Sequence, residues 1–506
     1  MTRNIQTRLA GFAAPAGVPL FAGVAAAAPW LADREEKHGR KLAKSLEDAI
    51  RASGLKNGMT ISFHHAFREG DQTINFVVAK LAEMGFRDLT LAPSSLLSCN
   101  TPLIEHIKSG VIRRIFTSGM RGKLAEAISN GLMDEPINVH SHGGRVHLMD
   151  RGEIAIDVAF LGVSTADPFG NANAVSGKSR CGSLGYAMVD AARARTVILL
   201  AEEIVAYPNA PASIRQDQVD LVVKVDQIGD PAKISVGAAR ITSNPRELLI
   251  ARWAADVMEH AGYFEDGFSM QTGTGGSATA TARFLEQKMR RKGIKAGFAL
   301  GGITGSIVDL HEKGLVGRIL DTQSFDAVAA ASLGKNPEHL EISTNYYANL
   351  TAKAASVDQV DMVILSALEI DLDFNVNVIT GSDGVMRGAS GGHSDTAAGA
   401  NLPIVVGPLI RSRIPTVVER CTTVVTPGET IGVLVTDHGI AVNPRRPEVA
   451  ELLKAAGLPV TTIEDLYGRA CALTGKPQPI EFLDKVVGII RYRDGSVIDV
   501  VRQVKG

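Results

Sequence analysis

The chain of 506 residues is poor in aromatic side chains and has no excess of either charge. Phe, Trp and Tyr make up 5% of it, and 53 Lys and Arg residues balance 54 Asp and Glu residues. Surfaces that bind nucleic acids are usually strongly basic, and anionic membranes attract polybasic segments. The composition therefore indicates neither a nucleic-acid partner nor a membrane partner.

Cysteines are few, and their spacing argues against two common uses. The four cysteines, Cys99, Cys181, Cys421 and Cys471, lie far apart and form no CxxC pair. Structural zinc sites usually contain such closely spaced ligands, and a chain of this size does not depend on a disulfide framework. The sequence favours reduced thiols and a cytoplasmic location.

Long hydrophobic runs are also missing, since no stretch reaches the roughly 20 apolar residues that a membrane-spanning helix needs. An apolar stretch near the N-terminus follows Arg3 and Arg8 and has the outline of a secretory signal, but Pro15 and Pro19 interrupt it. The better interpretation is that residues 1–40 form a variable tail that docks on a partner subunit.

What the sequence has in abundance is glycine, with 51 residues, and an alternation of strand-like and helix-like segments. This alternation is typical of βαβ units and predicts an α/β fold with parallel-rich sheets. Apolar runs predict the strands, and a helical hydrophobic period predicts a helix that Asp71 caps. The predicted strands are Gly58–Phe63, Leu89–Ala92, Val219–Val225, Met362–Ala367 and Val433–Val435, and this helix is Asp71–Met84.

A second helix, predicted from Asn244 to Glu259, locates the domain boundary. Asn244 is a good N-cap, Pro245 suits the first helical position, and Glu247 stands at the third. We place the boundary just before this helix, near Gly237.

The chain is too long for one hydrophobic core, so two or three domains are expected, and we divide it into two. The first comprises residues 41–237 and the second residues 238–506. The second includes a small C-terminal extension, from about Pro479, that is predicted to form a hairpin around Arg493-Asp-Gly-Ser.

The two halves share a weak internal repeat. Asp157-Val-Ala-Phe-Leu-Gly corresponds to Asp361-Met-Val-Ile-Leu-Ser, and the Asp and Asn residues of 167–173 correspond to those of 371–377. A repeat at this scale indicates two related domains and not a solenoid.

The segment 361–395 holds the densest group of candidate site residues. Its predicted strand leads to Glu369, then Asn375 and Asn377 alternate with valine, and the glycine-rich loop Gly388–His393 follows. Ligands of open α/β sheets bind beyond the carboxyl ends of the strands. Carboxylates, amides and exposed N–H groups there could bind an acid and stabilise an oxyanion. The alternative is a structural strand with a Gly-Gly turn and a helix cap.

This segment resembles the second domain of CoA-transferases, which carries SALE(V/I)D and NVN followed by a Gly-Gly loop. Four further segments fit the same comparison: GFSMQTGTGGSATA from Gly267, GGITGSIVDLHEKGLV from Gly301, VTPGETIGVLVTDHGIA from Val425 and DVAFLGVSTADPFGNAN from Asp157. Within that superfamily the chain is similar to citrate lyase alpha subunits from about Lys41 to Asn443. SFHHAFREGD, HSHGGRVH and YPNAPASIRQDQVDL belong to this match. The resemblance implies two domains, of the fold also called NagB/RpiA-like, that face each other across an active-site cleft.

The resemblance also implies the reaction, which exchanges acetyl for citryl on a thiol. Many CoA-transferases carry the acyl group on a glutamate just before a segment that aligns with Ile307-Val-Asp-Leu310. Here the residues from Leu300 to Ser306 include no carboxylate. The acid is therefore expected to attack the bound thioester directly. Glu369 remains a candidate substitute nucleophile, with an orienting or structural role as the alternative.

Two glycine-rich loops are the candidates for holding the reacting thioester. The N–H groups of Gly391 and Gly392 are the predicted oxyanion donors, with Glu369 and Asn377 as their catalytic neighbours. Asn375 is predicted to donate to a substrate carboxylate, and the alternative for both asparagines is an Asx turn. Thioester or phosphopantetheine contacts are predicted at Gly273, Gly275 and Gly276, where close helix–strand packing is the alternative.

The first domain supplies a predicted cationic cluster that would bind the acid. Its histidines and arginines follow three predicted strands, and arginine recognises carboxylates bidentately. Metal binding by His64/His65 or His140/His142 is the rival interpretation, but no neighbouring Asp or Cys completes a set, so no metal is predicted. The predicted substrate-binding residues are His64, His65, Arg68, Arg121, His142 and Arg145.

The resemblance implies partners and no tightly bound cofactor. A beta subunit and an acyl-carrier (gamma) subunit would form a hetero-oligomer with this chain. The carrier's CoA-like prosthetic group would supply the thiol, with acetyl-CoA as a surrogate. The alternatives are a free-standing CoA-transferase or acyl-CoA hydrolase, a citramalate lyase alpha subunit, and a non-catalytic scaffold subunit.

Overall fold

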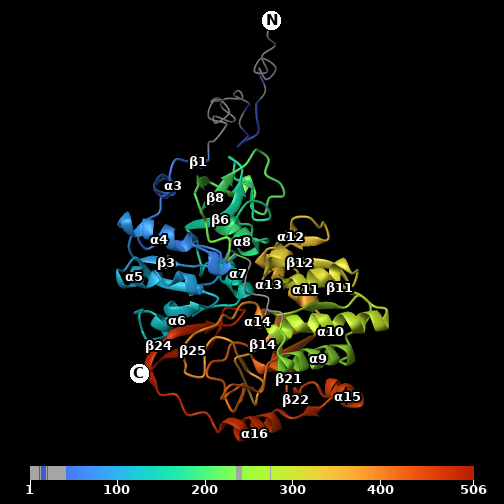
Figure 1. Ribbon diagram of the computed structural model, residues 1–506. Helices are drawn as coiled ribbons and strands as arrows, with labels where there is room; N and C mark the ends of the chain where they lie inside the picture. Colours follow the sequence, from blue (N-terminus) through green and yellow to red (C-terminus); the bar gives the residue numbers. More distant parts are fainter. Residues whose placement is uncertain are drawn as a thin grey trace.

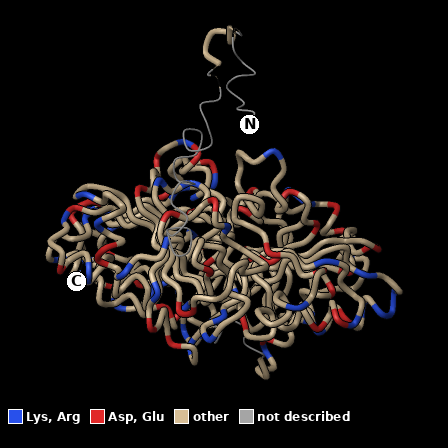
Figure 2. Tube along the Cα trace, turned by 90° about the horizontal axis from the view of Figure 1, so that it is seen from above, with Lys and Arg blue, Asp and Glu red and all other residues tan. Residues whose placement is uncertain are grey.

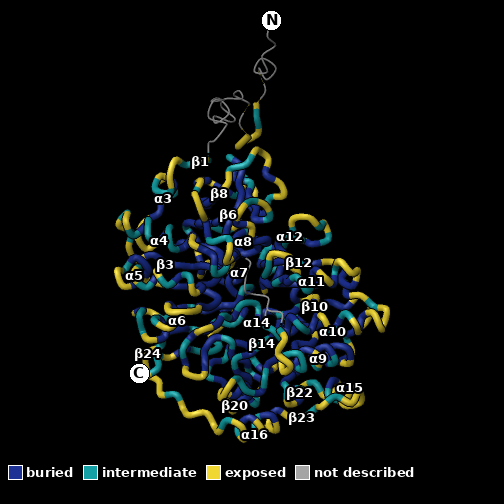
Figure 3. The backbone as a smooth tube through the Cα atoms, viewed as in Figure 1, coloured by how far each residue is buried: buried dark blue, intermediate teal, exposed yellow. Residues whose placement is uncertain are grey.

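The computed structural model describes residues 11, 13–18, 20, 41–234, 242–273 and 275–505. The predicted boundary near Gly237 and most of the predicted tail, residues 1–40, lie outside the described residues. Two sheets with helices on their faces make up most of the described part of the chain (Figure 1). Buried residues are concentrated in the strands and between the sheets and their helices (Figure 3). The predicted α/β architecture with parallel-rich sheets is confirmed.

The first sheet is built mainly from the N-terminal half. Its strands pair in parallel except for β7 and β25, which run antiparallel to their neighbours. In spatial order they are β1 (Leu42–Ala43), β9 (Leu221–Lys224), β8 (Thr196–Ile204), β6 (Val158–Ala166), β2 (Thr60–Ser62), β3 (Leu89–Leu91), β4 (Ile112–Thr117), β5 (Ile137–Val139), β24 (Phe482–Arg491) and β25 (Val497–Val504), with β7 (Ala172–Asn173) beside β6.

Helices cover both faces of this sheet because its central strands are apolar on both sides. In β6, Val158 and Phe160 belong to one core, while Ala159, Leu161 and Val163 belong to the other. This period of two is the geometry of a strand buried on both faces. The first core packs against α3 (Leu46–Ala52), α4 (Thr73–Glu83), α5 (Leu103–Lys108) and α6 (Gly122–Ser129), and the second against α7 (His142–Asp150) and α8 (Gly185–Arg193).

The second sheet repeats this plan. Its strands are parallel apart from β22, which is antiparallel to β21. Their spatial order is β13 (His339–Glu341), β12 (Val316–Ser324), β11 (Ala296–Ile303), β10 (Ser269–Gln271), β14 (Met362–Ser366), β17 (Leu402–Val406), β21 (Val433–Thr436), β22 (Gly439–Val442) and β23 (Val460–Thr461).

Helices flank this sheet on both faces too. Residues Met362 and Ile364 of β14 face one core, and Val363 and Leu365 face the other. One core includes α9 (Pro245–His260), α10 (Gly276–Lys292), α11 (Gly305–Glu312), α12 (Ala327–Leu333) and α15 (Pro447–Ala455), and the other includes α13 (Thr344–Ala348), α14 (His393–Gly399) and α16 (Ile463–Thr474). Short pairings join β15 (Glu369–Asp371) to β16 (Val376–Asn377) and β20 (Val417–Val418), and β18 (Ile410–Arg411) to β19 (Ile414–Pro415).

The two helices predicted from local sequence signals, α9 and α4, both form close to the predicted residues. Asn244 caps α9, its Oδ1 accepts from the Arg246 N–H at 3.0 Å, and Pro245 is the first helical residue. The α4 helix begins two residues later than predicted, with Gln72 at the cap position. The Asp71 carboxylate still accepts the Thr73 N–H at 2.7 Å.

The C-terminal hairpin forms as predicted, but it does not belong to the second domain. β24 pairs in parallel with β5, so β24 and β25 extend the first sheet and pack against α6 (Figure 1). The division into residues 41–237 and 238–506 is therefore wrong for this extension. Sequence order misled the assignment because edge pairing depends on which strand edge is free, and not on proximity along the chain.

The internal repeat is confirmed as repeated structure. Asp157 Oδ2 accepts the Thr60 N–H at 2.9 Å, and Asp361 Oδ2 accepts the Ser269 N–H at 2.8 Å, so each carboxylate ties together two neighbouring strand starts. In the second motif, Asp167 accepts from the N–H and Nδ2 of Asn171, and Asp371 accepts in the same way from Asn375.

Candidate functional site

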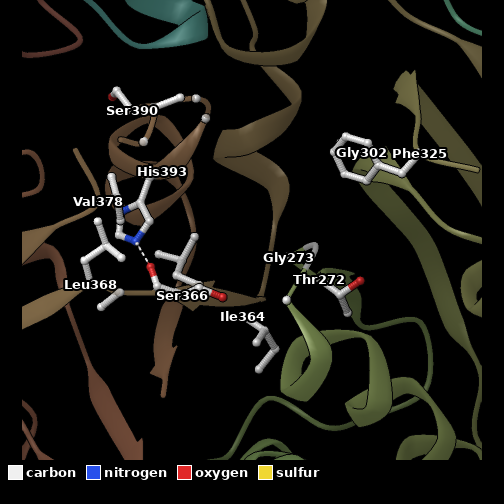
Figure 4. Close-up of a pocket in the computed structure, with 18 of the residues that line it drawn as sticks. Thr272, Gly273, Gly302, Phe325, Ile364, Ser366, Leu368, Val378, Ser390 and His393 are labelled. Atoms are coloured by element: carbon white, nitrogen blue, oxygen red, sulfur yellow. Dashed lines mark hydrogen bonds between the residues drawn. The ribbon is translucent and has the colours of Figure 1, made fainter. Parts of the chain in front are cut away.

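A cavity of about 720 Å³ lies between the two halves of the chain. The first half lines it with residues that follow β2, β3 and β4 and with the start of α7. The second half contributes the ends of β11 and β12, the loops after β10, β12 and β14, and the glycine-rich segment before α14. Figure 4 shows part of this wall, with Gly273, Gly302 and Phe325 on one side and Ser390 and His393 on another. Most of these positions follow strands at their carboxyl ends, where α/β folds bind ligands.

Two arginines give the cavity its positive charge in the first half. The Arg68 guanidinium lies 4.9 Å from the centre of the Phe325 ring, which comes from the second half. Burial, with Arg121 nearby, lowers the pKa of Arg68 to about 10. Within the part of the chain that the structure describes, neither Arg68 nor Arg121 forms an ion pair with a carboxylate. Both guanidinium groups are therefore available to an anionic ligand.

Arg68 also adopts an uncommon backbone conformation, with φ at +56°. A non-glycine residue in this region costs free energy unless its surroundings hold it there. Here Glu69, the next residue, accepts the N–H groups of Ser98 and Cys99. The turn that carries Arg68 is thereby tied to the loop after β3.

Three aromatic rings form a cluster beside the arginines. The Tyr186 ring centre lies 4.6 Å from that of His65 and 4.7 Å from that of His142. The Tyr186 hydroxyl is 3.0 Å from His142 Nε2, and His65 Nδ1 is 2.6 Å from Ser94 Oγ. The cluster therefore fixes the orientation of both histidine rings.

Both of these histidines are uncharged at neutral pH, which corrects the prediction of a mixed histidine and arginine cation cluster. Burial lowers the pKa of His142 to about 3, with Arg145 adding to the effect. Burial, followed by the charges of His142 and Arg68, lowers the pKa of His65 well below its usual value. Uncharged imidazoles can still exchange hydrogen bonds with a ligand, but the positive charge comes from arginine.

Two of the substrate-binding residues predicted in the first domain do not line the cavity. His64 is buried, and its Nε2 lies 2.8 Å from the carbonyl oxygen of Gly162. Arg145 forms a buried bidentate ion pair with Asp190, at 2.5 and 3.0 Å, and donates to the carbonyl of Ala92. A side chain just beyond a strand can turn into the core instead of the cleft, and sequence position does not decide which.

The glycine-rich loop before α14 is held by the first half of the chain. The Met120 N–H donates to Gly388 O at 3.1 Å, the Ser390 N–H to Ser118 O at 2.7 Å, and the His142 N–H to Gly391 O at 2.8 Å. Gly391 has φ at +55°, which suits glycine. These contacts hold the predicted oxyanion donors, Gly391 and Gly392, in the part of the cavity wall that the second half supplies.

The second glycine-rich segment also lines the cavity. Gly273, Gly275 and Gly276 lie where the chain passes from β10 into α10. A Cβ at Gly276 would lie 2.3 Å from Glu247 Oε2, so this segment passes close to the first turn of α9. The alternative, close packing, is therefore confirmed at Gly276, and the thioester contact stays a prediction.

The end of β11 offers no acyl acceptor. Gly301 and Gly302 line the cavity, and a Cβ at Gly302 would lie 1.9 Å from the Phe325 ring. This is the segment in which many CoA-transferases carry a glutamate, according to the resemblance above. Phe325 fills the space in front of it, so a side chain at Gly302 could not enter the cavity without displacing that ring.

The rest of the described surface shows no concentration of one charge and no group of metal-binding side chains. Acidic and basic residues are interspersed over the molecule (Figure 2). Among the described residues, no three His, Cys, Asp or Glu side chains are grouped to hold a metal ion, and no helix is both long and apolar enough to cross a membrane. The four cysteines are free thiols.

Comparison with known proteins decides the family. Residues 39–504 match the family described as citrate lyase, alpha subunit (CitF). The chain belongs to this family. It is 67% identical over 491 residues to the citrate lyase alpha chain of Klebsiella pneumoniae, covering 97% of each chain, and 64% identical over 471 residues to that of Escherichia coli (strain K12), covering 93% of this chain and 92% of the relative.

Solved structures agree with the assignment to the citrate lyase alpha subunit family. A Streptococcus mutans chain assigned to the alpha subunit of citrate lyase, crystallised in complex with citrate, is 52% identical and has a TM-score of 0.91, with 92% of each chain covered. A malonate decarboxylase alpha subunit from Acinetobacter baumannii is 17% identical, with a TM-score of 0.61 over 87% of this chain and 94% of that one. The second likeness shows a shared fold alone.

In the SALE and NVN segments, Ser366, Ala367 and Leu368 line the cavity, whereas Glu369, Asn375 and Asn377 do not. Glu369 Oε2 accepts from Asn377 Nδ2 and from the Thr422 N–H, each at 2.8 Å, and Glu369 is buried outside the cavity. Asn377 Oδ1 accepts the N–H groups of Ile379 and Thr380. The prediction that Glu369 and Asn377 are catalytic neighbours of the thioester is corrected: they shape the turn that leads to the glycine-rich loop.

Asn375 is likewise structural. Its Oδ1 accepts the Gly428 N–H at 2.9 Å, and its Nδ2 donates to Asp371 at 3.3 Å. In the first half, Asn171 Oδ1 accepts the Gln216 N–H at 3.0 Å in the equivalent way. The Asx-turn alternative therefore describes Asn375, because the repeat uses the same asparagine for the same turn in a half where no thioester is expected.

A Glu369→Gln variant is expected to lose about 1–3 kcal/mol of stability and to keep near-normal turnover. The amide has only one accepting oxygen. At least one of the three donors, the Thr422 N–H, the Thr422 hydroxyl or the Asn377 amide, therefore loses its acceptor. Urea unfolding and an acyl-exchange assay measure the two effects. Glu419→Gln, at a nearby exposed carboxylate, should change neither. Loss of turnover without loss of stability would restore Glu369 as a reacting group.

Sequence reasoning missed several residues that line the cavity. Tyr186 and Tyr347 stand in helices where an isolated aromatic residue usually indicates core packing, and Phe325 follows a strand with no motif. Gln271 lies within the recognised segment from Gly267, and its side chain exchanges hydrogen bonds with the Tyr347 hydroxyl at 3.1 and 3.2 Å. Only Gln271 carried a signal, as a polar residue that ends a strand.

Proposed function

We propose that this chain is the acyl-transferring subunit of a citrate lyase, converting acetyl-carrier and citrate into citryl-carrier and acetate. The observation that carries the proposal is the cavity lined by Arg68 and Arg121, which form no ion pair among the described residues, and by the glycine-rich loops of the second half. A tricarboxylate needs such cations. The bound citrate named for the Streptococcus mutans structure supports citrate as the acid.

The proposed reaction needs no group from the enzyme to become acylated. A carboxylate oxygen of citrate attacks the thioester carbonyl, the C–S bond breaks, and the thiolate leaves with a mixed anhydride behind it. The thiolate then attacks the citryl carbonyl of the anhydride, and acetate leaves. Oxygen and sulfur thus exchange places on two carbonyl carbons, and no proton or electron is gained or lost overall.

The roles of the chain follow from charge. Arg68 and Arg121 would hold the carboxylates that do not react, and uncharged His65 and His142 would add hydrogen bonds. The N–H groups of Gly391 and Gly392 would stabilise the oxyanion that forms at each attack. Because anhydrides hydrolyse readily, the position of the site between two halves would also help to limit access of water.

This mechanism predicts that no covalent acyl- or CoA-enzyme accumulates. The full chain is incubated with acetyl-CoA and isotopically labelled citrate or acetate, and label exchange is followed. Borohydride reduction and mass spectrometry then search for a reduced glutamate. Exchange without an adduct is expected, since the cavity lacks a carboxylate at the end of β11. An adduct on any residue would overturn direct transfer, and absence of exchange with every acid would overturn the activity.

We also propose the partners and the source of the thiol. A beta subunit and an acyl-carrier subunit would complete a cytoplasmic hetero-oligomer, and the carrier's CoA-like group would reach the cavity along Gly273, Gly275 and Gly276. The chain itself would hold no tightly bound cofactor. The free thiols and the absence of a membrane-spanning helix among the described residues fit this proposal.

The same exchange assay separates the alternatives. A citramalate lyase subunit would prefer labelled citramalate, and an acyl-CoA hydrolase would release acetate without exchange. A free-standing CoA-transferase would use free CoA thioesters as well as the carrier. A scaffold subunit would do none of these. Family membership and the retained arginines favour the citrate reaction.

A further inference from the structure

A buried carboxylate links the two walls of the cavity. Asp395 stands in the first turn of α14, three residues after Gly392, and is fully buried. Its Oδ1 accepts from Ser141 Oγ at 2.7 Å, and its Oδ2 accepts from the Gly143 N–H at 2.8 Å. Both donors belong to the start of α7 in the first half. One carboxylate thus joins segments about 250 residues apart in the chain.

The residue between these two donors is His142, which lines the cavity. Its own N–H donates to Gly391 O at 2.8 Å. Three hydrogen bonds therefore cross between the start of α7 and the segment 391–395. They fix the His142 ring on one side relative to the predicted oxyanion donors on the other.

The residues around this junction are closely packed. A Cβ at Gly143 would lie 2.0 Å from Ala348 O and 2.8 Å from Asp395 Oδ1. Ser141 also caps α7, since its Oγ accepts the Gly144 N–H at 2.9 Å. A change at Asp395 would therefore be transmitted to the start of α7 and not absorbed locally.

A cation from the C-terminal hairpin lies next to the Asp395 carboxylate. Arg493, in the turn between β24 and β25, is buried, and its Nε lies 3.9 Å from Asp395 Oδ1. Its Nη2 lies 4.0 Å from Asp358. The hairpin that extends the first sheet thus brings a positive charge to the junction between the halves.

We propose that Asp395 is a positioning residue that holds His142 and the Gly391–Gly392 loop in the geometry needed for acyl transfer, with Arg493 as the cation beside its carboxylate. The activity readout of this inference rests on the proposed function. Asp395 is buried and is not among the described residues that line the cavity. It acts through the residues that do.

The ionisation of Asp395 gives the inference a pH signature. Burial raises its pKa to about 6, while Arg493, the Gly143 N–H and Ser141 lower it and Asp358 raises it. The titratable groups near it on neighbouring elements are Tyr186 on α8, Tyr347 on α13, Asp358 before β14, and Arg493 and Tyr492 on the hairpin. Below about pH 6 the carboxylate takes up a proton and one acceptor is lost, so turnover should fall there.

The test compares four variants of the full chain by acetyl exchange between pH 5 and 8. Asp395→Asn should hold kcat about a hundredfold below the wild-type plateau, as misplacement of about 1 Å does, and its profile should have no acid limb. Arg493→Met removes a group that lowers the pKa, so its acid limb should move to higher pH. Arg493→Lys keeps the charge and should restore the wild-type limb. Asp494→Asn, in the same turn, is the matched control and should match the wild type.

Hydrogen–deuterium exchange supplies a readout that does not depend on activity. Asp395→Asn should speed exchange in residues 141–145 and 388–395 together, while distant α16 keeps its protection. An unchanged acid limb and kcat in Asp395→Asn would overturn the inference while the wild type remains active. Absence of exchange activity in the wild type would overturn the proposed function alone, and the deuterium result would then decide whether Asp395 holds the two segments.

Discussion

A Gly392→Ala variant is expected to fold and to bind the acyl thioester, but to lose about a hundredfold or more in turnover. A Cβ at this position would lie 2.5 Å from the Tyr347 hydroxyl oxygen, and Tyr347 is buried. The loop or the tyrosine must therefore move, and the N–H groups of Gly391 and Gly392 would leave the place where the oxyanion forms. Loss of a single oxyanion donor typically costs about 10²–10³ in kcat.

The control for this variant is Gly468→Ala. Gly468 lies within α16, where a Cβ would meet no atom within 4 Å. It should leave turnover unchanged and slightly raise stability, because alanine favours a helix more than glycine does. Steady-state kinetics and thioester binding measure both variants. Near-normal turnover in Gly392→Ala would make the loop structural and direct attention to Gly273, Gly275 and Gly276.

Replacing Arg68 or Arg121 by alanine is expected to raise the KM for citrate by about tenfold or more, with little change in thioester binding. A charge-assisted hydrogen bond contributes about 1.5–3 kcal/mol. Neither guanidinium forms an ion pair within the described residues, so its removal should act on the ligand and not on the fold. Exchange kinetics at varied citrate and acetyl-CoA measure the two effects separately.

Arg113→Ala serves as the control for the arginine variants. Arg113 lies on the same β4 strand that leads to Arg121, but it is exposed and pairs with Asp134 at 2.9 Å, away from the cavity. Its removal should leave the citrate KM unchanged. An unchanged KM in both the Arg68 and the Arg121 variants would refute their role in acid binding.

Local chemistry explains why so much of the fold was predictable. The short apolar segments of β3, β14 and β21 favour buried strands because helices are usually longer. Asn244 starts α9 by capping an N–H group of its first turn, and Pro245 suits the first helical position. The repeated Asp and Asn residues form the same turns in both halves because their hydrogen bonds reach only a few residues along the chain.

The place of each predicted site residue was less predictable, because it depends on which way a side chain turns beyond its strand. His65 and Arg68 reach the cavity, whereas His64 turns to Gly162 and Arg145 pairs with Asp190 in the core. Glu369 belongs to a motif that suggested a reacting group, but its hydrogen bonds with Asn377 and Thr422 are those of a structural residue. Burial then removes the charge of the histidines, which no sequence pattern shows.

The sequence by itself determined the α/β class, the repeat, the glycine-rich loops and the missing acyl acceptor, because each depends on the order of residues within a short segment. Only the tertiary structure decided that α7 meets the segment before α14, that Tyr186 and Tyr347 line the cavity, and that the C-terminal hairpin extends the first sheet to bring Arg493 behind Asp395. These contacts join residues hundreds of positions apart. They arise from packing between two complete domains, which local propensity does not encode.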